Sequence, residues 1–487
     1  MRSKANNPAP ISPVPWTVGA LRLPDGYFNA RLTTRSPNSP TPPELGAGGR
    51  NKLMLDIKQI RTEPERVKER LRARLADPAA IDAVLDVDTR LRTAQTEAER
   101  QQADLNRQTK ASGQAIGQLM KEGKRDEAEA LKAGLRDLGD RIGAMNEDVK
   151  RLETERDALL FYIPNLPSEQ TPPGPEENFQ IVKTHGEPKA FDFEPKPHWD
   201  IATDLDLIDF TRGVKLSGSG FVLYKGLGAM LERGLIQFML DLHRIKHGYT
   251  EWSTPFFLSR ESVKASAHLP KFQPEMYHDA EDDLFALPTA EPALVNIHRD
   301  EILDGRDLPL SYVAYSPCWR REAGAAGKDT RGLLRVHQFD KVEMVKYTLP
   351  ETSYDELERL LTDATDVLET LGLPYRVKLL AAGDISFAAS QCYDVEIYAP
   401  GVGAWLEVSS CSNCEDFQAR RGNIRFRREP GSKPEFPHLL NGSGTALPRL
   451  VATLLETYQQ PDGSVLVPEP LRPYLGGLSV LNRPESV

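Results

Sequence analysis

The stretch SPCWRREAGAAGKDTRGLLRVHQFDKVEMVKY, residues 316–347, sets the expectation for the fold of the C-terminal half. Two runs rich in aromatic and β-branched residues flank a glycine-rich, charged loop, which predicts a long β-hairpin. Arg320 and Glu322 are expected on its first strand and Phe339 on the return strand. A guanidinium suits a phosphate oxygen, a carboxylate can accept from an amino group, and a phenyl ring can stack on a base. Taken alone, however, an arginine-rich hairpin is more often a solvated surface.

Similar short β-rich runs continue through the chain after residue 178. YDVEIY, 393–398, and AWLEVSS, 404–410, are two of them, and helical patterns cover residues 229–247 and 354–372. Strands mixed with helices of this length indicate an α+β domain built around a mainly antiparallel sheet. We expect this domain to occupy residues 181–487.

The preceding part of the chain has a different amino-acid composition. No proline occurs between Pro78 and Pro164, and Ala, Leu, Glu, Arg and Gln dominate. KEGKRD, 121–126, interrupts the pattern with a glycine and clustered charges, so we expect two helices of about 40 residues, each roughly 60 Å long, folded back as an antiparallel coiled-coil pair. The expected seam residues are Leu131, Leu135, Leu138, Ile142, Met145, Val149 and Leu152, and, less regularly, Leu91, Ala94, Ala98, Leu105, Ser112, Ala115 and Leu119.

Two interpretations of this helical domain, residues 54–165, stay open at this point. A bare heptad pattern usually indicates a dimerisation coiled coil. However, a helical hairpin buries its apolar seam between its own two helices and does not need a second chain for this. Because its polar faces also carry Lys and Arg, it fits an arm that contacts a long partner. Prolines and a glycine in the following residues 166–180 predict a linker to the α+β domain.

Residues 1–53 contain nine prolines, seven basic residues and two acidic ones, with no sustained periodicity, which predicts disorder. A transit peptide is one interpretation, since such segments are rich in Arg and poor in acids. The many prolines suit an amphipathic transit helix poorly. We therefore favour a misassigned start, with Met54 as the true first residue.

The composition limits the possible functions. Hydrophobic residues make up 39% and charged residues 27%, and no apolar run of about 18 residues supports a membrane role. The net charge of −10 argues against broad nucleic-acid binding but leaves room for a local basic patch. Only four cysteines occur, which suits a reducing cytosol and predicts a cytoplasmic protein.

Two of those cysteines, Cys411 and Cys414, form a C-x-x-C pair in EVSSCSNCEDF, 407–417. A structural zinc site would need two further ligands, and neither the nine histidines nor Cys318 and Cys392 provide a second pair nearby. A redox role needs an exposed, electropositive thiolate, which this apolar strand does not suggest. We therefore expect the pair to pack in the interior.

Taken together, the segments resemble those of the class II aminoacyl-tRNA synthetases in their seryl version. Residues 316–347 resemble motif 2 of that family. GYTEWSTPFF, 248–257, with Pro255, resembles motif 1, and NGSGTALPRLVATLLETYQ, 441–459, with Arg449 at a helix start, resembles motif 3.

Two further segments carry the seryl character of the resemblance. LPTAE, 287–291, is similar to the family's serine loop, and WLEVSSCSNCEDFQARR, 405–421, is similar to its seryl-specific strand and loop. The likeness runs over about residues 54–460 in the family's order, helical arm included. It implies an antiparallel-sheet class II catalytic domain that follows an N-terminal tRNA-binding arm.

The resemblance implies a nucleotide site for ATP. Arg320 is expected to hold the α-phosphate and the serine carboxylate, and Glu322 to accept from the adenine amino group. Phe339 and Arg449 are expected to sandwich the adenine, with Arg335 reaching the terminal phosphates. The other nucleotide-site residues implied by the resemblance are Arg321, Val336, Glu407, Val408, Ser409 and Ser410.

The resemblance also implies that Glu407 and Ser410 coordinate Mg²⁺ that bridges the phosphates, which fits the hard oxygen ligands that this ion requires. Activation brings a carboxylate to the α-phosphorus of ATP, so cations must neutralise two anions and hold them in line. Arg320, Arg449 and Mg²⁺ supply this without a general base. The expected catalytic residues are therefore Arg320, Glu407 and Arg449.

The implied serine pocket contains Thr289, Glu291, Glu343 and Ser443, with Ala290 in the same loop and Arg320 at its edge. Glu343 is the best candidate for accepting the serine hydroxyl. Alanine would leave that buried carboxylate unpaired and be rejected strongly. Threonine must then be excluded by size and glycine by lost contacts.

The expected partners also follow from the resemblance. Motif 1 implies a homodimer, and the arm implies a grip on the long variable arm of tRNA(Ser), while tRNA(Sec) stays an open possibility. A related ligase that loads an amino acid on a carrier protein is the alternative function, against which the complete long arm argues. An inactive binding module is the third reading, against which the retained Arg320, Glu322, Glu407 and Arg449 argue.

The chain departs from the family's pattern at three positions. Pro292 follows Glu291 directly, and Gln391 stands where a lysine is common. Pro448 precedes Arg449 at a helix start, where proline is tolerated. None of these changes removes an expected catalytic group.

Overall fold

The computed structural model of the chain describes residues 55–323 and 331–483. Residues 1–54, 324–330 and 484–487 lie outside the described residues, and with them the expectation of disorder or a misassigned start for residues 1–53. Across the described residues, no helix combines the length and the apolar run that crossing a bilayer requires.

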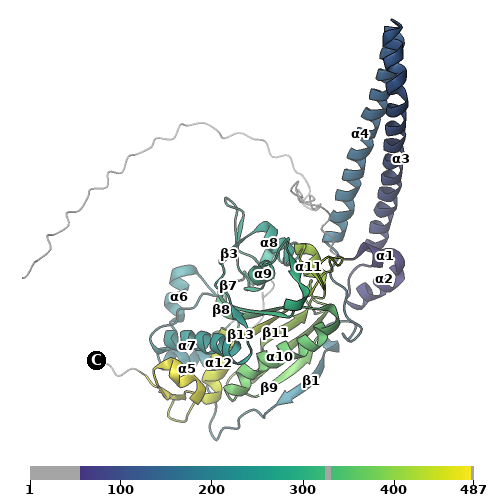
Figure 1. The fold of residues 1–487 in the computed structure, drawn as a ribbon. Coiled ribbons are helices and arrows are strands. Elements are labelled where there is room, and N and C mark those ends of the chain that lie inside the picture. Colours follow the sequence, from purple (N-terminus) through teal and green to yellow (C-terminus); the bar gives the residue numbers. More distant parts are fainter. Residues whose placement is uncertain (1–54, 324–330, 484–487) are drawn as a thin grey trace, which may run out of the picture. The chain divides into compact units, whose positions relative to one another are not determined.

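An eight-stranded sheet forms the centre of the C-terminal part (Figure 1). All neighbouring strands are antiparallel except β2, which runs parallel to β7. The prediction of an α+β fold around a mainly antiparallel sheet is confirmed. In sheet order the strands are β1 (Gln180–His185), β9 (Tyr375–Leu379), β10 (Gln391–Ala399), β11 (Ala404–Asn413), β13 (His438–Ala446), β8 (Gln338–Thr348), β7 (Leu310–Trp319) and β2 (Thr250–Glu251).

Residues 316–347 form most of the β7–β8 hairpin, which is paired from Leu310 with Tyr347 to Trp319 with Gln338. The expectation that Arg320 and Glu322 lie on its first strand is wrong, because β7 ends at Trp319. The Arg320 N–H still donates across the hairpin to the His337 carbonyl at 3.0 Å, and the backbone leaves the hairpin after Arg320. The Arg321 N–H donates to the Glu275 carbonyl at 2.8 Å, and Glu322 has a left-handed φ of +50°.

Three helices, α7 (Leu227–Asp241), α10 (Ser353–Thr370) and α12 (Leu447–Tyr458), pack on one face of the sheet (Figure 1). Their apolar residues recur at helical spacing and share a core with Val342 and Met344 of β8. Because successive strand residues point to opposite faces, Lys341 and Glu343 face away from these helices. This alternation places charged groups of β8 on the side where the cavity lies.

The remaining elements are short and surround the sheet. Within the described residues, three small sheets accompany the large one. They are β3 (Phe257–Ser259) with β5 (Leu284–Ala286) and β4 (His278–Asp279), β6 (Ile302–Asp304) with β12 (Arg425–Arg427), and β14 (Val465–Leu466) with β15 (Val480–Leu481). The short α-helices are α5 (His198–Asp204), α6 (Phe210–Ser217), α8 (Arg260–Ala265), α9 (Glu291–Val295) and α11 (Phe417–Gly422).

The helical domain contains the two long helices that were expected, α3 (Ala79–Lys121) and α4 (Arg125–Phe161). They run antiparallel, with the Gln95 amide donating to Glu153 across the pair at 3.1 Å. Leu91, Ala98, Leu138, Ile142 and Leu152 of the expected seam are buried. Two other seam assignments are wrong. Ala115 is exposed while its larger neighbour Ile116 is half-buried, and Leu131 near the turn is 39% exposed.

A buried carboxylate ties the base of this helix pair to α1 (Ile57–Thr62). Asp88, 1% exposed, accepts two hydrogen bonds of 2.7 Å from Arg61. Arg156 of α4 lies 3.9 Å from the same carboxylate. A buried charge is costly unless it is paired, so Asp88 and its arginines hold α1, α3 and α4 together at this end.

The end of α2 (Pro64–Ala73) contacts the α+β domain directly. Arg74, which follows α2, is buried and donates to the carbonyls of Ser386 at 2.8 Å and Ile385 at 3.2 Å. The Asn165 amide donates to the carbonyl of Ala388 at 2.8 Å. The helical domain therefore holds the β9–β10 connection through hydrogen bonds to its backbone carbonyls.

Residues 166–180, expected as a linker, follow the same connection. The Ser168 N–H donates to the Ser390 carbonyl at 2.8 Å, and the Ser168 hydroxyl donates to Gln391 at 2.9 Å. Gln391, one of the departures from the family's pattern, is 1% exposed and is used in this contact. The stretch has almost no regular structure, yet it is fastened to the domain that follows it.

The packing of β13 makes one position intolerant of a side chain. A Cβ on Gly444 would lie 2.6 Å from Nε2 of buried His243 and 3.2 Å from Val342. Gly444→Ala should therefore lower the free energy of unfolding by about 1–3 kcal/mol, measured by denaturant titration. Gly143→Ala on α4 is the control, because nothing lies within 4 Å of its Cβ, and it should stabilise slightly. Equal stability of G444A and wild type would contradict this packing.

Candidate active site

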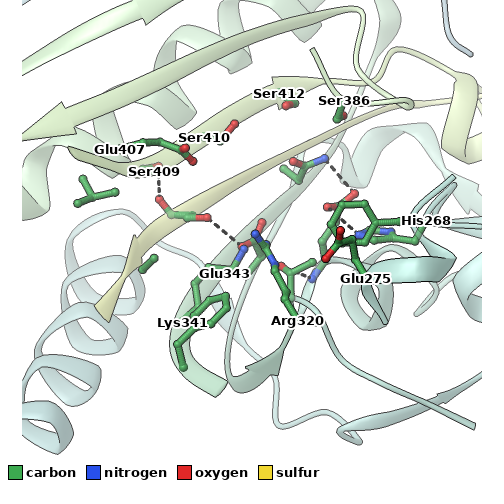
Figure 2. Close-up of a pocket in the computed structure, with 18 of the residues that line it drawn as sticks. His268, Glu275, Arg320, Lys341, Glu343, Ser386, Glu407, Ser409, Ser410 and Ser412 are labelled. Atoms are coloured by element: carbon green, nitrogen blue, oxygen red, sulfur yellow. Dashed lines mark hydrogen bonds and ion pairs between the residues drawn. The ribbon is translucent and has the colours of Figure 1, made fainter. Parts of the chain in front are cut away.

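A cavity of about 790 Å³ opens on the face of the sheet away from α7, α10 and α12. Strands β8, β11 and β13, the β9–β10 connection and the loop before α9 all contribute to its wall. Figure 2 shows Glu407, Ser409, Ser410 and Ser412 along one strand, with Arg320, Lys341 and Glu343 across from them. The expected site residues that line it are Thr289, Glu291, Arg320, Glu322, Arg335, Val336, Phe339, Glu343, Glu407, Val408, Ser409, Ser410, Ser443 and Arg449.

Two expected site residues do not line the cavity. Ala290 is fully buried and occupies the N-cap position of α9, which begins at Glu291, without a side-chain hydrogen bond to the helix. Arg321 turns away, with its Nε donating to the Met276 carbonyl at 3.0 Å and its guanidinium 4.5 Å from the centre of the Tyr277 ring. The backbone leaves the hairpin between the two neighbouring arginines, so of these two only Arg320 faces the cavity.

Arg320 is oriented by its surroundings while its end stays accessible. Its Nε donates to the Pro288 carbonyl at 3.2 Å, and the guanidinium lies 5.3 Å from the ring centre of Phe339. Among the described residues, its two terminal nitrogens have no hydrogen-bond partner. A fixed guanidinium with two free donor nitrogens is suited to bind two oxygens of an anion.

Arg449 provides a second cation, from the start of helix α12. It lies in the first turn of α12, just after Pro448, as expected for a proline at a helix start. Its Nη1 donates to the backbone carbonyl of Glu407 at 2.7 Å and lies 3.5 Å from that residue's carboxylate. The arginine therefore connects the helix to β11 and brings positive charge to the cavity.

Glu407 and Ser410 offer oxygen ligands on β11. The Glu407 side chain is 47% exposed, and the Ser410 hydroxyl is half-buried beside the Cys392 thiol at 3.1 Å. No group of three or more His, Cys, Asp or Glu residues gathers at metal-binding distance within the described part of the chain. Two oxygens at an open cavity fit Mg²⁺, because that ion keeps several waters and binds substrate phosphates.

Glu322 and Arg335 contact each other at the outer part of the cavity. Arg335 Nη1 lies 2.9 Å from the Glu322 carboxylate, and both side chains are partly exposed. A pair at this exposure contributes little to stability. Its two members are therefore free to exchange partners when a ligand offers an amino group to one and phosphates to the other.

Several polar residues that line the cavity or lie beside it were not predicted from the sequence. Lys341, on β8, lies 2.6 Å from the Glu343 carboxylate. Asn441 and Gln418 both donate to the Glu291 carboxylate, at 3.2 and 2.7 Å. His268 also lines the cavity. Strand alternation makes Lys341 and Asn441 face the same side as Glu343 and Ser443, so the sequence contained a signal for these two residues. His268 follows α8 and Gln418 lies in α11, and no comparable pattern marks either of them.

The acid groups of this region are perturbed by burial. Burial raises the pKa of Glu291 to about 7, with a further contribution from the negative charge of Glu343. Burial also lowers the pKa of His268 to about 3, and Arg320 and Lys341 act in the same direction. Glu291 thus exchanges its proton near neutral pH, while His268 is neutral there.

The C-x-x-C pair is part of the interior. Cys411 and Cys414 have no exposed surface, and they join different hydrophobic cores. Burial raises the pKa of the Cys411 thiol to about 12 and that of Cys414 well above its usual range. The side chains therefore pack as small apolar groups, as the sequence analysis favoured.

Pro292 lies in the first turn of α9, a position that tolerates proline. The start of the helix therefore accommodates the proline that departs from the family's pattern at this position. Glu291, the first residue of α9, still lines the cavity.

Comparisons with known proteins agree with this geometry. A family model for the seryl-tRNA synthetase N-terminal domain matches residues 54–167, and one for the tRNA synthetase class II core domain (G, H, P, S and T) matches residues 272–458. The serine–tRNA ligases of Roseiflexus sp. and Geobacillus thermodenitrificans are each 51% identical to the chain over 88% of its length and all of theirs.

Solved structures give the same result. The seryl-tRNA synthetase from Pyrococcus horikoshii complexed with ATP is 36% identical, with a TM-score of 0.82 over 89% of this chain and 100% of that one. The cytoplasmic serine–tRNA ligase from Naegleria fowleri in complex with AMP is 30% identical, with a TM-score of 0.75 over 86% of this chain and 96% of that one. The chain belongs to the seryl-tRNA synthetase family of class II aminoacyl-tRNA synthetases.

Proposed function

We propose that the chain is a serine–tRNA ligase, which joins serine to ATP as seryl-adenylate and then transfers the seryl group to the 3′-terminal adenosine of tRNA(Ser). One observation carries the proposal most directly. Arg320, with two donor nitrogens free, lines the same cavity as a carboxylate–hydroxyl pair suited to serine, Glu343 and Ser443, and the Glu407 and Ser410 oxygens suited to a metal-bound nucleotide. The relatives and the ATP-bound neighbour support it.

The activation step requires positive charge rather than a base. A serine carboxylate oxygen forms a bond to the α-phosphorus while the bond from that phosphorus to the β-phosphate oxygen breaks, and pyrophosphate leaves. Arg320 binds both the carboxylate and the α-phosphate, which lowers their repulsion and orients them. When bound, Mg²⁺ held by Glu407 and Ser410 neutralises charge on the phosphates.

Serine recognition falls to the inner part of the cavity. Glu343 accepts from the substrate hydroxyl, and Ser443, which donates to Glu343 at 3.2 Å, fixes the carboxylate. Glu291 and Thr289 receive the ammonium group. A pocket that bonds a hydroxyl rejects alanine strongly, because the buried acceptor would then lose its partner.

The remaining parts of the chain complete the proposal. The α3–α4 pair grips the long variable arm of tRNA(Ser) through shape and backbone contacts, as RNA helices are usually recognised. Motif 1, around β2, forms a homodimer interface, and tRNA(Sec) is a further substrate to be tested. The buried, free cysteines suit work in the cytoplasm.

Pyrophosphate exchange across the twenty amino acids tests the activation step. Serine should stimulate exchange of label between pyrophosphate and ATP, and alanine, glycine and threonine should each fall at least about 100-fold below it in kcat/KM. Stimulation by another amino acid and not by serine would overturn the proposed function.

Serine binding should depend on pH through Glu291. Because the pKa of this carboxyl is raised to about 7 in the folded protein, it is protonated below that pH and cannot neutralise the substrate ammonium. The KM for serine should therefore fall as pH rises through about 7 and level off above it, at saturating ATP. Neighbouring His268, whose pKa is lowered to about 3, does not titrate in this range. A KM for serine that is constant from pH 6 to 8 would contradict this role.

A further inference from the structure

Lys341 is a buried cation in the cavity to which the activation chemistry assigns no role. Its side chain is 8% exposed, and that of its partner Glu343 is 3% exposed. Both residues face the cavity from β8, and Figure 2 shows them on the same strand. Such a pair is kept at a cost, since removing two charges from water is expensive even when they attract each other.

The contacts of the Glu343 carboxylate are distributed unevenly over its two oxygens. Lys341 Nζ lies 2.6 Å from Oε2, and the Ser443 hydroxyl donates to the same oxygen at 3.2 Å. In the part of the chain that the structure describes, the other oxygen, Oε1, has no hydrogen-bond partner. Two donors on one oxygen fix the carboxylate and leave the second oxygen to accept from a ligand in the cavity.

This arrangement discriminates between ligands by their hydrogen-bond donors. An ionised carboxylate is an acceptor only, so Oε1 requires a donor from the ligand, and a hydroxyl supplies one. A carboxyl that lost its cation would be free to hold a proton and to rotate, and would then tolerate a ligand without a donor. The cation beside Glu343 therefore matters for what Glu343 selects.

We propose that Lys341 is a specificity-determining positioning residue, which acts through Glu343 to select an amino acid with a side-chain hydroxyl. The inference rests on the proposed function, because it takes the ligand of Oε1 to be serine. Lys341 does not serve the phosphates, since its ammonium group is bound to Glu343 while the terminal nitrogens of Arg320 are free.

The test measures pyrophosphate exchange by full-length Lys341→Met with serine, alanine and ATP varied separately. The kcat/KM for serine should fall about 100-fold or more, because Glu343 loses its buried partner. The KM for ATP should stay within about threefold, and the preference for serine over alanine should fall by about as much as the serine kcat/KM. Lys341→Gln is measured in parallel. If one of the two variants fails to fold, the same kinetic comparison between serine, alanine and ATP can be made with the other.

The chain offers a closely matched control. Lys346 lies on the same strand with its side chain 6% exposed, and it is paired at 3.1 Å with Glu356, which is 5% exposed, but neither residue lines the cavity. Lys346→Met removes an equally buried ion pair and should lower stability. It should leave the preference for serine over alanine within about threefold of wild type.

A double variant tests whether Lys341 acts through Glu343. If it does, adding Lys341→Met to Glu343→Gln should reduce the serine kcat/KM by no more than about threefold further, since coupled residues are not additive. Three results would overturn this inference and leave the proposed function standing. They are losses of serine kcat/KM that multiply in the double variant, a parallel rise in the KM for ATP in K341M, and an unchanged preference of K341M for serine over alanine. A wild-type enzyme that activates another amino acid in place of serine would overturn the proposed function and this inference with it.

Discussion

Arg320→Ala should lower the kcat/KM for serine-dependent pyrophosphate exchange by about 1,000-fold or more. The guanidinium is held by the Pro288 carbonyl and the Phe339 ring, and its two free nitrogens face the cavity, so removing it leaves two anions without their shared cation. Most of the loss should appear in kcat, because the charge that Arg320 stabilises is greatest in the transition state. Arg320→Lys should recover only part of it, since an ammonium group cannot bind two oxygens in one plane.

Arg321→Ala provides the comparison for this experiment. The two arginines are adjacent in sequence, but Arg321 packs on Tyr277 outside the cavity. We expect R321A to lose no more than about tenfold, through altered support of the loop rather than lost charge at phosphorus. Comparable losses in R320A and R321A would contradict the placement of Arg320 as the residue at the reacting atoms.

Shortening the helical arm should separate the two half-reactions. Replacing residues 99–147 by a short glycine-containing turn keeps Asp88 with its arginines and the buried Leu91 and Leu152 at the base. Pyrophosphate exchange with serine should stay within about twofold of wild type, because the cavity keeps all its lining residues. Charging of tRNA should fall by about 100-fold or more, since a large part of the RNA contact surface is lost.

Thermal unfolding of the shortened enzyme provides the control for folding. The truncation leaves the contacts of Arg74 and Asn165 with the β9–β10 connection in place, so the α+β domain should unfold near the wild-type temperature. Equal loss of exchange and charging in a folded, shortened enzyme would show that the arm serves the cavity rather than the tRNA.

Local patterns predicted much of this structure. The β7–β8 hairpin and the two long helices followed from residue spacing and from the breaks at glycine and clustered charges. The backbone bend after Arg320 was not predicted, because it depends on a hydrogen bond from Arg321 to Glu275, a residue distant in sequence. For the same reason no local pattern predicted that Arg321 faces outward.

The cavity was predicted less completely than the strands that form it. Lys341 shares the facing of Glu343, yet a lysine in a strand is ordinarily a solvated surface residue, so its burial became evident only from the packing. The contacts of Arg74 with the carbonyls of Ile385 and Ser386 join segments that lie more than 300 positions apart. Such contacts depend on how the domains pack, and composition or periodicity does not encode them locally.

Charging of total tRNA with each labelled amino acid in turn tests the central claim most directly. We predict that serine alone becomes attached in an ATP-dependent, RNase-sensitive form, and that the charged RNA is tRNA(Ser) with its long variable arm. Label carried by a different amino acid, or serine attached to a carrier protein in place of RNA, would contradict the account.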